Sequence, residues 1–187
     1  MSAVSTASAL DFRSLWDQGI SFEQFLAESA PAHLPLWQGV YRTAVIPAWS
    51  LRPSVPPTLR LLVLAEDWCG DAANTIPVVQ RWAESVGVEL RILKRDEHPD
   101  VMDRYLTNGS RSIPIIIGLD DGFRELGHWG PRPAELQAWV MAHKDTMEKN
   151  ARYKEVRRWY AKDRGETTLR EVLGAVGVRG QGVKGQK

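Results

Sequence analysis

The sequence predicts an α/β fold in which helices flank a small mixed sheet and a helical extension precedes that sheet. Two apolar segments typical of buried strands, residues 59–66 and 88–93, enclose a segment whose apolar residues recur at helical spacing. A third apolar run, Ile113–Ile117, is followed by an Asp-Gly turn signal. The order of elements is strand, helix, strand and hairpin. We expect the strands and the hairpin to form one sheet with helices on both faces.

Length, charge and cysteine content limit the class of protein. The 187 residues, of which 43% are apolar and eight are tryptophan, suffice for one domain with an ordinary core. The net charge of +1 gives no global indication of nucleic-acid or membrane-surface binding. No apolar run approaches the ~20 residues of a membrane span, and the N-terminus lacks the features of a secretory signal. The single cysteine excludes an internal disulfide, so we expect a cytoplasmic protein. The oligomeric state is not indicated.

Three helical patterns precede the sheet. Apolar residues at helical spacing predict helices over residues 10–16 and 34–45. Between them, Ser21 and Gln24 form a capping-box pattern that predicts the start of another helix. We therefore assign residues 1–57 to an N-terminal helical extension and a proline-rich connection.

The central elements alternate in type. The strand at 59–66 leads into a helix over 71–86, and the alternating segment at 88–93 predicts a second strand parallel to the first. A short helix is expected at 99–107. The apolar run Ile113–Ile117 that follows, with the Asp-Gly turn at Asp121-Gly122, predicts a hairpin of two antiparallel strands.

The C-terminal part is expected to be helical. The pattern predicts one long helix over 133–161 and a short helix around 167–175. The tail from Gly177 is rich in glycine and basic residues, a composition typical of disorder. We assign residues 58–163 to the main domain and 164–187 to a short helix and a flexible basic tail.

The only thiol lies where the first strand gives way to a helix. The free N–H groups and the dipole of a first helical turn stabilise a thiolate at Cys69. Asp71 and the Glu66-Asp67 pair oppose this, because a nearby carboxylate disfavours a second negative charge. The sequence does not determine the sign of the net pKa shift. A small buried residue without chemistry is the alternative interpretation.

Two prolines occupy unusual positions. Pro77 lies inside the helical pattern that follows Cys69, where it removes a backbone hydrogen bond and kinks the helix. Pro114 follows Ile113 at the head of the most apolar run of the chain. A cis peptide bond there would let the strand begin directly after a tight turn, and a trans proline that starts the strand is the alternative.

These features together resemble the thioredoxin family. The resemblance rests on WCGDA, the later proline, the Ile-Pro pair and the hairpin, and it covers residues 58–145. The strings TNGSRSIPIII and HWGPRPAEL are similar to a bacterial subgroup that has a single-cysteine Trp-Cys-Gly-Asp-Ala motif and an added helical N-terminal region. The resemblance implies a thioredoxin fold with Cys69 as the attacking cysteine, Pro77 as the helix-kinking proline and Pro114 as the cis-proline. The partner or substrate groove that it implies comprises Trp68, Gly70, Asp71, Ile113 and Pro114.

The sequence also departs from the family pattern. Where the family has Cys-Gly-Pro-Cys, this chain has Asp71 and Ala72 at the last two positions. Ala72 cannot resolve a mixed disulfide, so the two-thiol exchange cycle is unavailable within this chain. The family also places a buried acid six residues before the attacking cysteine, and here that position is Val63.

We therefore expect thiol redox chemistry through Cys69 alone, as in a monothiol thiol-disulfide oxidoreductase. The partners would be protein or low-molecular-weight thiols and disulfides, with glutathione as a candidate co-substrate. The alternatives are a redox-silent adaptor that binds protein through the same groove, and a thiol peroxide sensor.

The sequence gives separate predictions for the binding of metals and of anions. The Cys-Gly-Phe-Ser motif of monothiol glutaredoxins is absent, so we expect no iron–sulfur cluster. The four histidines show no ligand spacing, so we expect no metal and no resident cofactor. Arg111, two residues before Ile113, is a candidate contact for an anionic ligand such as a glutathione carboxylate, and a solvated or ion-paired arginine is the alternative.

Overall fold

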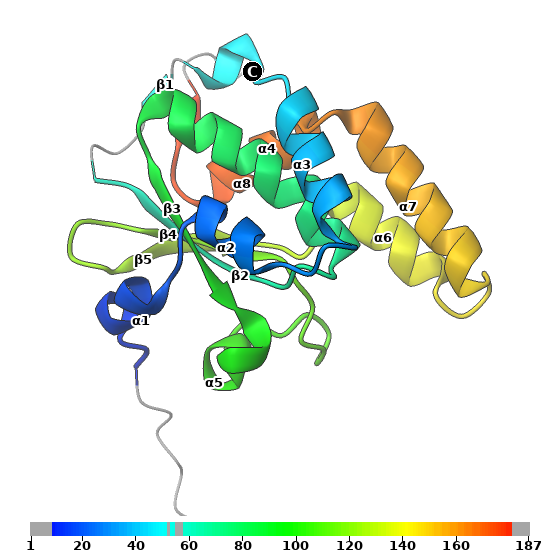
Figure 1. The fold of residues 1–187 in the computed structure, drawn as a ribbon, viewed down its shortest axis with the longest axis horizontal. Helices are drawn as coiled ribbons and strands as arrows, with labels where there is room; N and C mark the ends of the chain where they lie inside the picture. The colour runs from blue at the N-terminus through cyan, green and yellow to red at the C-terminus, as the bar shows by residue number, and fades with distance from the viewer. Residues whose placement is uncertain (1–8, 52, 55–57, 181–187) are drawn as a thin grey trace, which may run out of the picture.

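A four-stranded mixed sheet forms the centre of the molecule (Figure 1). The computed structural model describes residues 9–51, 53–54 and 58–180. The strand order is β3-β2-β4-β5; β2 and β3 are parallel, and β4 is antiparallel to both β2 and β5. The strands are β2 (Arg60–Ala65), β3 (Glu89–Lys94), β4 (Ile115–Leu119) and β5 (Glu125–Trp129). The predicted fold class is confirmed.

One face of the sheet is covered by α4 (Gly70–Val86) and α8 (Glu166–Ala175), which pack against each other. The end of α8 approaches β4 closely at Gly118, where an added Cβ would lie 2.6 Å from the Cβ of Val176. Glycine at this position therefore sets how near α8 lies to the sheet.

The opposite face is covered by α1 (Phe12–Gln18). Arg91 aligns across the sheet with Ile117, the neighbour of Gly118, so its side chain points away from α8. The Trp16 ring of α1 lies 4.9 Å from the Arg91 guanidinium. Helices thus lie on both faces, as the order of elements predicts.

The other N-terminal helices, α2 (Phe22–Glu28) and α3 (Leu34–Thr43), border β3 and α4. The Ser21 hydroxyl caps α2 by accepting the Gln24 N–H at 3.1 Å. On α3, Trp37 is fully buried. It belongs to the same apolar cluster as the strands, so the N-terminal helices share the core of the sheet.

The C-terminal part differs from the expectation of one long helix, which is wrong. Two helices, α6 (Ala134–His143) and α7 (Lys149–Asp163), lie side by side instead (Figure 1). A new helix starts after Glu148 because the Glu148 carboxylate accepts the N–H groups of Asn150 and Ala151 and so caps α7.

The tail also departs from its prediction over its first residues. Val178 is buried, and β6 (Arg179–Gly180) pairs with β1 (Pro53–Ser54). The remainder of the predicted disordered tail lies outside the described residues, as do residues 1–8. The short helix predicted at 99–107 is a single turn, α5 (Pro99–Met102). Two 3-10 turns complete the structure, η1 (Ala48–Ser50) and η2 (Arg95–Glu97).

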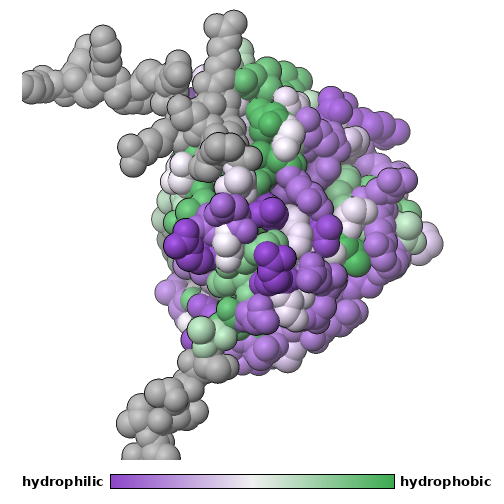
Figure 2. All heavy atoms as spheres, turned by 90° about the vertical axis from the view of Figure 1, so that its left-hand side faces the viewer, coloured by the Kyte–Doolittle hydropathy of each residue, from purple (hydrophilic) through white to green (hydrophobic). Residues whose placement is uncertain are grey.

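The surface at the end of the molecule that carries the β4–β5 turn is mostly hydrophilic, with smaller apolar areas between the polar ones (Figure 2). Within the described ranges, no helix combines the length and the apolar character needed to cross a membrane.

The close approach of α8 to β4 gives a stability prediction. Gly118→Ala places a methyl group against Val176, and such overpacking is expected to lower the free energy of unfolding by about 1–3 kcal/mol. Gly39→Ala, inside α3 with open space around it, is the matched control and should raise that free energy by about 0.5–1 kcal/mol. Urea unfolding followed by tryptophan fluorescence measures both. Equal midpoints for the two variants would contradict the close packing of α8.

Candidate functional site

Cys69 is the residue at which α4 begins. Its backbone is extended, with φ −82° and ψ 112°, and its carbonyl oxygen accepts the N–H of Ala73 at 2.9 Å, which makes it the N-cap. The thiol donates to the carbonyl oxygen of Ile113 at 3.5 Å. The side chain therefore links the start of α4 to the loop before β4, and only 8% of the residue is exposed.

The structure determines the direction of the thiol's pKa shift, which the sequence left open. Burial raises the pKa of Cys69 to about 11, and the negative charge of Asp71 adds to this effect. The N–H groups of Ala72 and Asp71 and the charge of Arg132 lower it, but by less. The thiol is consequently protonated at neutral pH.

A buried acid lies in the first turn of α4. The Asp71 residue is 9% exposed. One carboxylate oxygen pairs with the Arg132 guanidinium at 2.6 Å, and the other accepts the hydroxyl of Tyr160 at 3.0 Å. Burial raises the pKa of Asp71, while the arginine and the tyrosine favour its charged form. The acid therefore has one cationic and one neutral partner, both from the C-terminal half of the chain.

Arg132 is held by its own surroundings as well. Pro131 and Pro133 flank it, and the Gly130–Pro131 peptide bond is cis. Its guanidinium donates to the Gln137 side chain of α6 at 2.9 Å. Sequence reasoning missed both Arg132 and Tyr160. The available signal was an arginine between two prolines, in a chain whose first-turn acid needs a cationic partner once it is buried.

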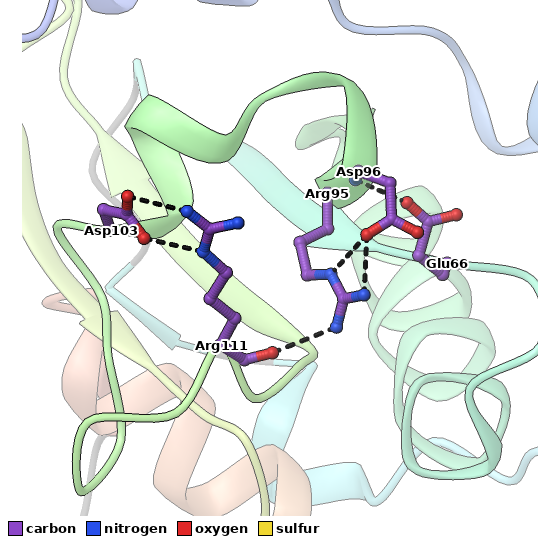
Figure 3. Close-up of polar contacts among 5 residues, drawn as sticks. All are labelled: Glu66, Arg95, Asp96, Asp103 and Arg111. Atoms are coloured by element: carbon purple, nitrogen blue, oxygen red, sulfur yellow. Dashed lines mark hydrogen bonds and ion pairs between the residues drawn. The ribbon is translucent and has the colours of Figure 1, made fainter.

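The two acids before Trp68 are anchored differently from each other. Glu66 is buried, and its carboxylate accepts the N–H of Asp96 at 2.7 Å (Figure 3). Burial raises the pKa of Glu66. The Asp67 carboxylate instead accepts the N–H of Ala30 at 2.7 Å, between α2 and α3.

The loop before β4 carries the Ile113–Pro114 peptide bond, which is cis. Both residues are buried. Arg111, in the same loop, forms a two-pronged ion pair with Asp103, with nitrogen–oxygen distances of 2.7 and 2.8 Å (Figure 3). The candidate anion contact thus has an acidic partner already, in an exposed position where such a pair contributes little to stability.

Trp68 is half exposed beside the thiol, and the Arg95 guanidinium lies 4.9 Å from its ring. Arg95 also donates to the backbone carbonyl of Arg111 at 3.0 Å and pairs with Asp96 at 2.6 Å (Figure 3). Arg95 therefore joins the Trp68 loop to the loop before β4.

A cavity of about 390 Å³ adjoins the thiol. The predicted residues that line it are Trp68, Cys69, Gly70, Asp71, Arg111 and Ile113. Pro114 is buried and does not line it. Sequence reasoning missed six lining residues, Arg95, Ser112, Arg132, Tyr153, Val156 and Arg157. The structure thus brings most of the predicted groove together and closes it with residues of α7.

A second cavity is remote from the thiol. This larger cavity, of about 870 Å³, lies between α2, α3, α4 and β3, and Cys69 does not line it. Across the part of the chain that the structure describes, no group of three or more histidine, cysteine or acidic side chains is placed to hold a metal ion.

The charges around the thiol predict that two variants shift the pKa of Cys69 in opposite directions. Asp71→Asn removes a charge that raises the pKa of Cys69, so its alkylation midpoint should move below the wild-type value of about 11. Arg132→Gln removes a charge that lowers this pKa, so the midpoint should move up. A shift of one unit changes the alkylation rate below the midpoint by roughly tenfold. The measurement is the rate of iodoacetamide labelling against pH, with circular dichroism to check folding.

The control for this experiment is Asp121→Asn at the β4–β5 turn, which removes a carboxylate that is not among the groups that shift the thiol's pKa. Shifts of the same sign in the Asp71 and Arg132 variants would contradict the electrostatic account.

The family model described as thioredoxin matches residues 19–160. A comparison with curated proteins gave no significant match. Among solved structures, a protein of unknown function from Pseudomonas aeruginosa is similar at a TM-score of 0.71 and 21% identity, over 89% of this chain and 96% of that chain. An HIV epitope-scaffold is similar at a TM-score of 0.68 and 19% identity, over 88% and 96%.

At these identities the two solved structures show the shared fold, and their similarity extends over most of this chain. The family model likewise matches well over half of the sequence. The chain belongs to the thioredoxin family.

Proposed function

We propose that this member of the thioredoxin family carries out thiol–disulfide exchange through Cys69 as its only thiol. The observation that carries the proposal is the position of the sulfur, at a cavity and next to a buried carboxylate. Ala72, which occupies the place of a second cysteine, is fully buried and supplies no thiol. The exchange therefore needs a thiol from another molecule to complete it.

Asp71 is the proton acceptor in the first step. Because the pKa of Cys69 is about 11, a free thiolate is rare at neutral pH, and a nearby base becomes important. The thiol, which donates to the Ile113 carbonyl in the resting structure, turns away from it and transfers its proton to the Asp71 carboxylate as the sulfur attacks one sulfur of the substrate disulfide. The substrate S–S bond breaks and a mixed disulfide with Cys69 forms. The second substrate sulfur leaves as a thiolate and takes the proton back from Asp71.

A low-molecular-weight thiol completes the cycle. It attacks the substrate sulfur of the mixed disulfide, forms a new disulfide with it and releases the Cys69 sulfur, which is protonated again. The net change is an exchange of one thiol for another in the substrate disulfide, with no net oxidation. Arg132 and Tyr160 are positioning residues, because they hold the Asp71 carboxylate rather than contacting the sulfur.

A redox-silent binding role is the second candidate, and the raised pKa of the buried thiol favours it. In that role the half-exposed Trp68 and the loop around Ile113 would contact a partner protein, and Cys69 would only fill space. The two candidates differ in whether Cys69 ever forms a bond to another sulfur.

The deciding experiment is the reaction of the full-length protein with hydroxyethyl disulfide, followed by intact mass. We expect one adduct per chain and none in Cys69→Ser. The rate constant should rise by much less than tenfold per pH unit from about pH 6 to pH 8, because transfer of the proton to Asp71 removes the need for a free thiolate. In Asp71→Asn the rate should instead rise about tenfold per pH unit, because only the free thiolate reacts.

No adduct in the folded protein, together with complete labelling of the thiol in urea, would refute exchange and favour the binding role. A rate that rises tenfold per pH unit in the wild type as well would remove Asp71 from the mechanism, while the exchange itself would stand.

A further inference from the structure

We infer that the molecule exchanged at Cys69 is a small disulfide or thiol that carries carboxylate groups, rather than a protein disulfide. This inference rests on the proposed exchange and specifies its substrate class.

The shape of the site is the first observation. Tyr153, Val156 and Arg157 of α7 line the same cavity as Cys69 and Ile113. Helix α7 therefore forms a wall beside the thiol and the loop before β4. A volume of about 390 Å³ falls within the ~300–1,000 Å³ of small-molecule pockets. An extended protein segment would have to pass this wall to reach Cys69, a residue that is only 8% exposed.

The charge of the site is the second observation. Four arginines from different parts of the chain line the cavity, and Asp71 is the only acid among the lining residues. They are Arg95 of η2, Arg111 of the loop before β4, Arg132 of the loop before α6 and Arg157 of α7. A guanidinium presents paired N–H donors that match a carboxylate.

The arginines differ in their availability. Arg95, Arg111 and Arg132 are each paired with an aspartate, at 2.6, 2.7 and 2.6 Å. Arg157 is exposed and has no ion-pair partner among the residues that the structure describes. Its charge is therefore not offset locally, and α7 supplies both the wall and the unpaired cation. We assign to Arg157 the main contact with a substrate carboxylate.

The test uses three small symmetrical disulfides that differ in charge: dithiodipropionate (anionic), hydroxyethyl disulfide (neutral) and cystamine (cationic). Adduct formation at Cys69 is followed by intact mass, and each rate is divided by the rate of the same disulfide with the urea-unfolded protein. At about 10 mM salt we expect the anionic disulfide to react at least about tenfold faster than the cationic one, and this preference should shrink at about 0.5 M salt.

Two variants locate the effect on α7. Arg157→Gln should reduce the anionic preference several-fold. Lys154→Gln removes the same charge from the same helix at a position that does not line the cavity, and should reduce the preference much less. Equal losses in both variants would overturn the assignment to Arg157.

The remaining outcomes separate this inference from the proposed function. Equal normalised rates for the three disulfides would overturn the substrate class and leave exchange at Cys69 standing. A faster normalised reaction with insulin than with dithiodipropionate would overturn the preference for small molecules. Absence of any adduct would refute the exchange itself, and with it this inference.

Discussion

The ion pair between Asp71 and Arg132 is the constraint on which the arrangement of the site depends. A carboxylate buried in the first turn of α4 is stable only with a counter-charge and further hydrogen bonds. Arg132 and Tyr160 supply these, at 2.6 and 3.0 Å. Because Tyr160 belongs to α7 and Arg132 precedes α6, satisfying one acid fixes both C-terminal helices against the thiol. The wall of the cavity is thus a consequence of where the acid is buried.

The N-terminal helices hold the other side of the loop that carries Trp68 and leads into Cys69. Asp67 accepts the backbone N–H of Ala30 through its carboxylate and the Trp37 indole N–H through its carbonyl, at 2.7 and 2.8 Å. The residue before Trp68 is therefore tied to the segment between α2 and α3. Cys69 lies between two independent supports, one from each end of the chain, and this limits how far the loop can open. Through these two hydrogen bonds the N-terminal helices help to hold the segment that precedes the thiol.

The fold was predictable from the sequence because strand and helix periodicity is local. The break in the predicted long C-terminal helix was missed because the start of α7 depends on a single cap at Glu148. Cys69 and its neighbours were predictable because they are adjacent in sequence or carry the family motif. Arg95 and Arg157 were not, because only the folded chain brings them to the cavity. The burial of Cys69, which raises the pKa of the thiol most, and the nearby charge of Asp71, which adds to this effect, are likewise properties of tertiary packing.

The high pKa of Cys69 affects the two halves of an exchange differently. A thiolate of high pKa is a strong nucleophile but a poor leaving group, so the mixed disulfide forms readily once the proton is removed and releases Cys69 slowly. Release becomes faster if the departing sulfur is protonated as it leaves. By microscopic reversibility, the group that accepts the proton in the attack donates it in the release. An acid whose own pKa is raised by burial is better suited to that return step than an exposed one, which connects the burial of Asp71 to the absence of a second thiol.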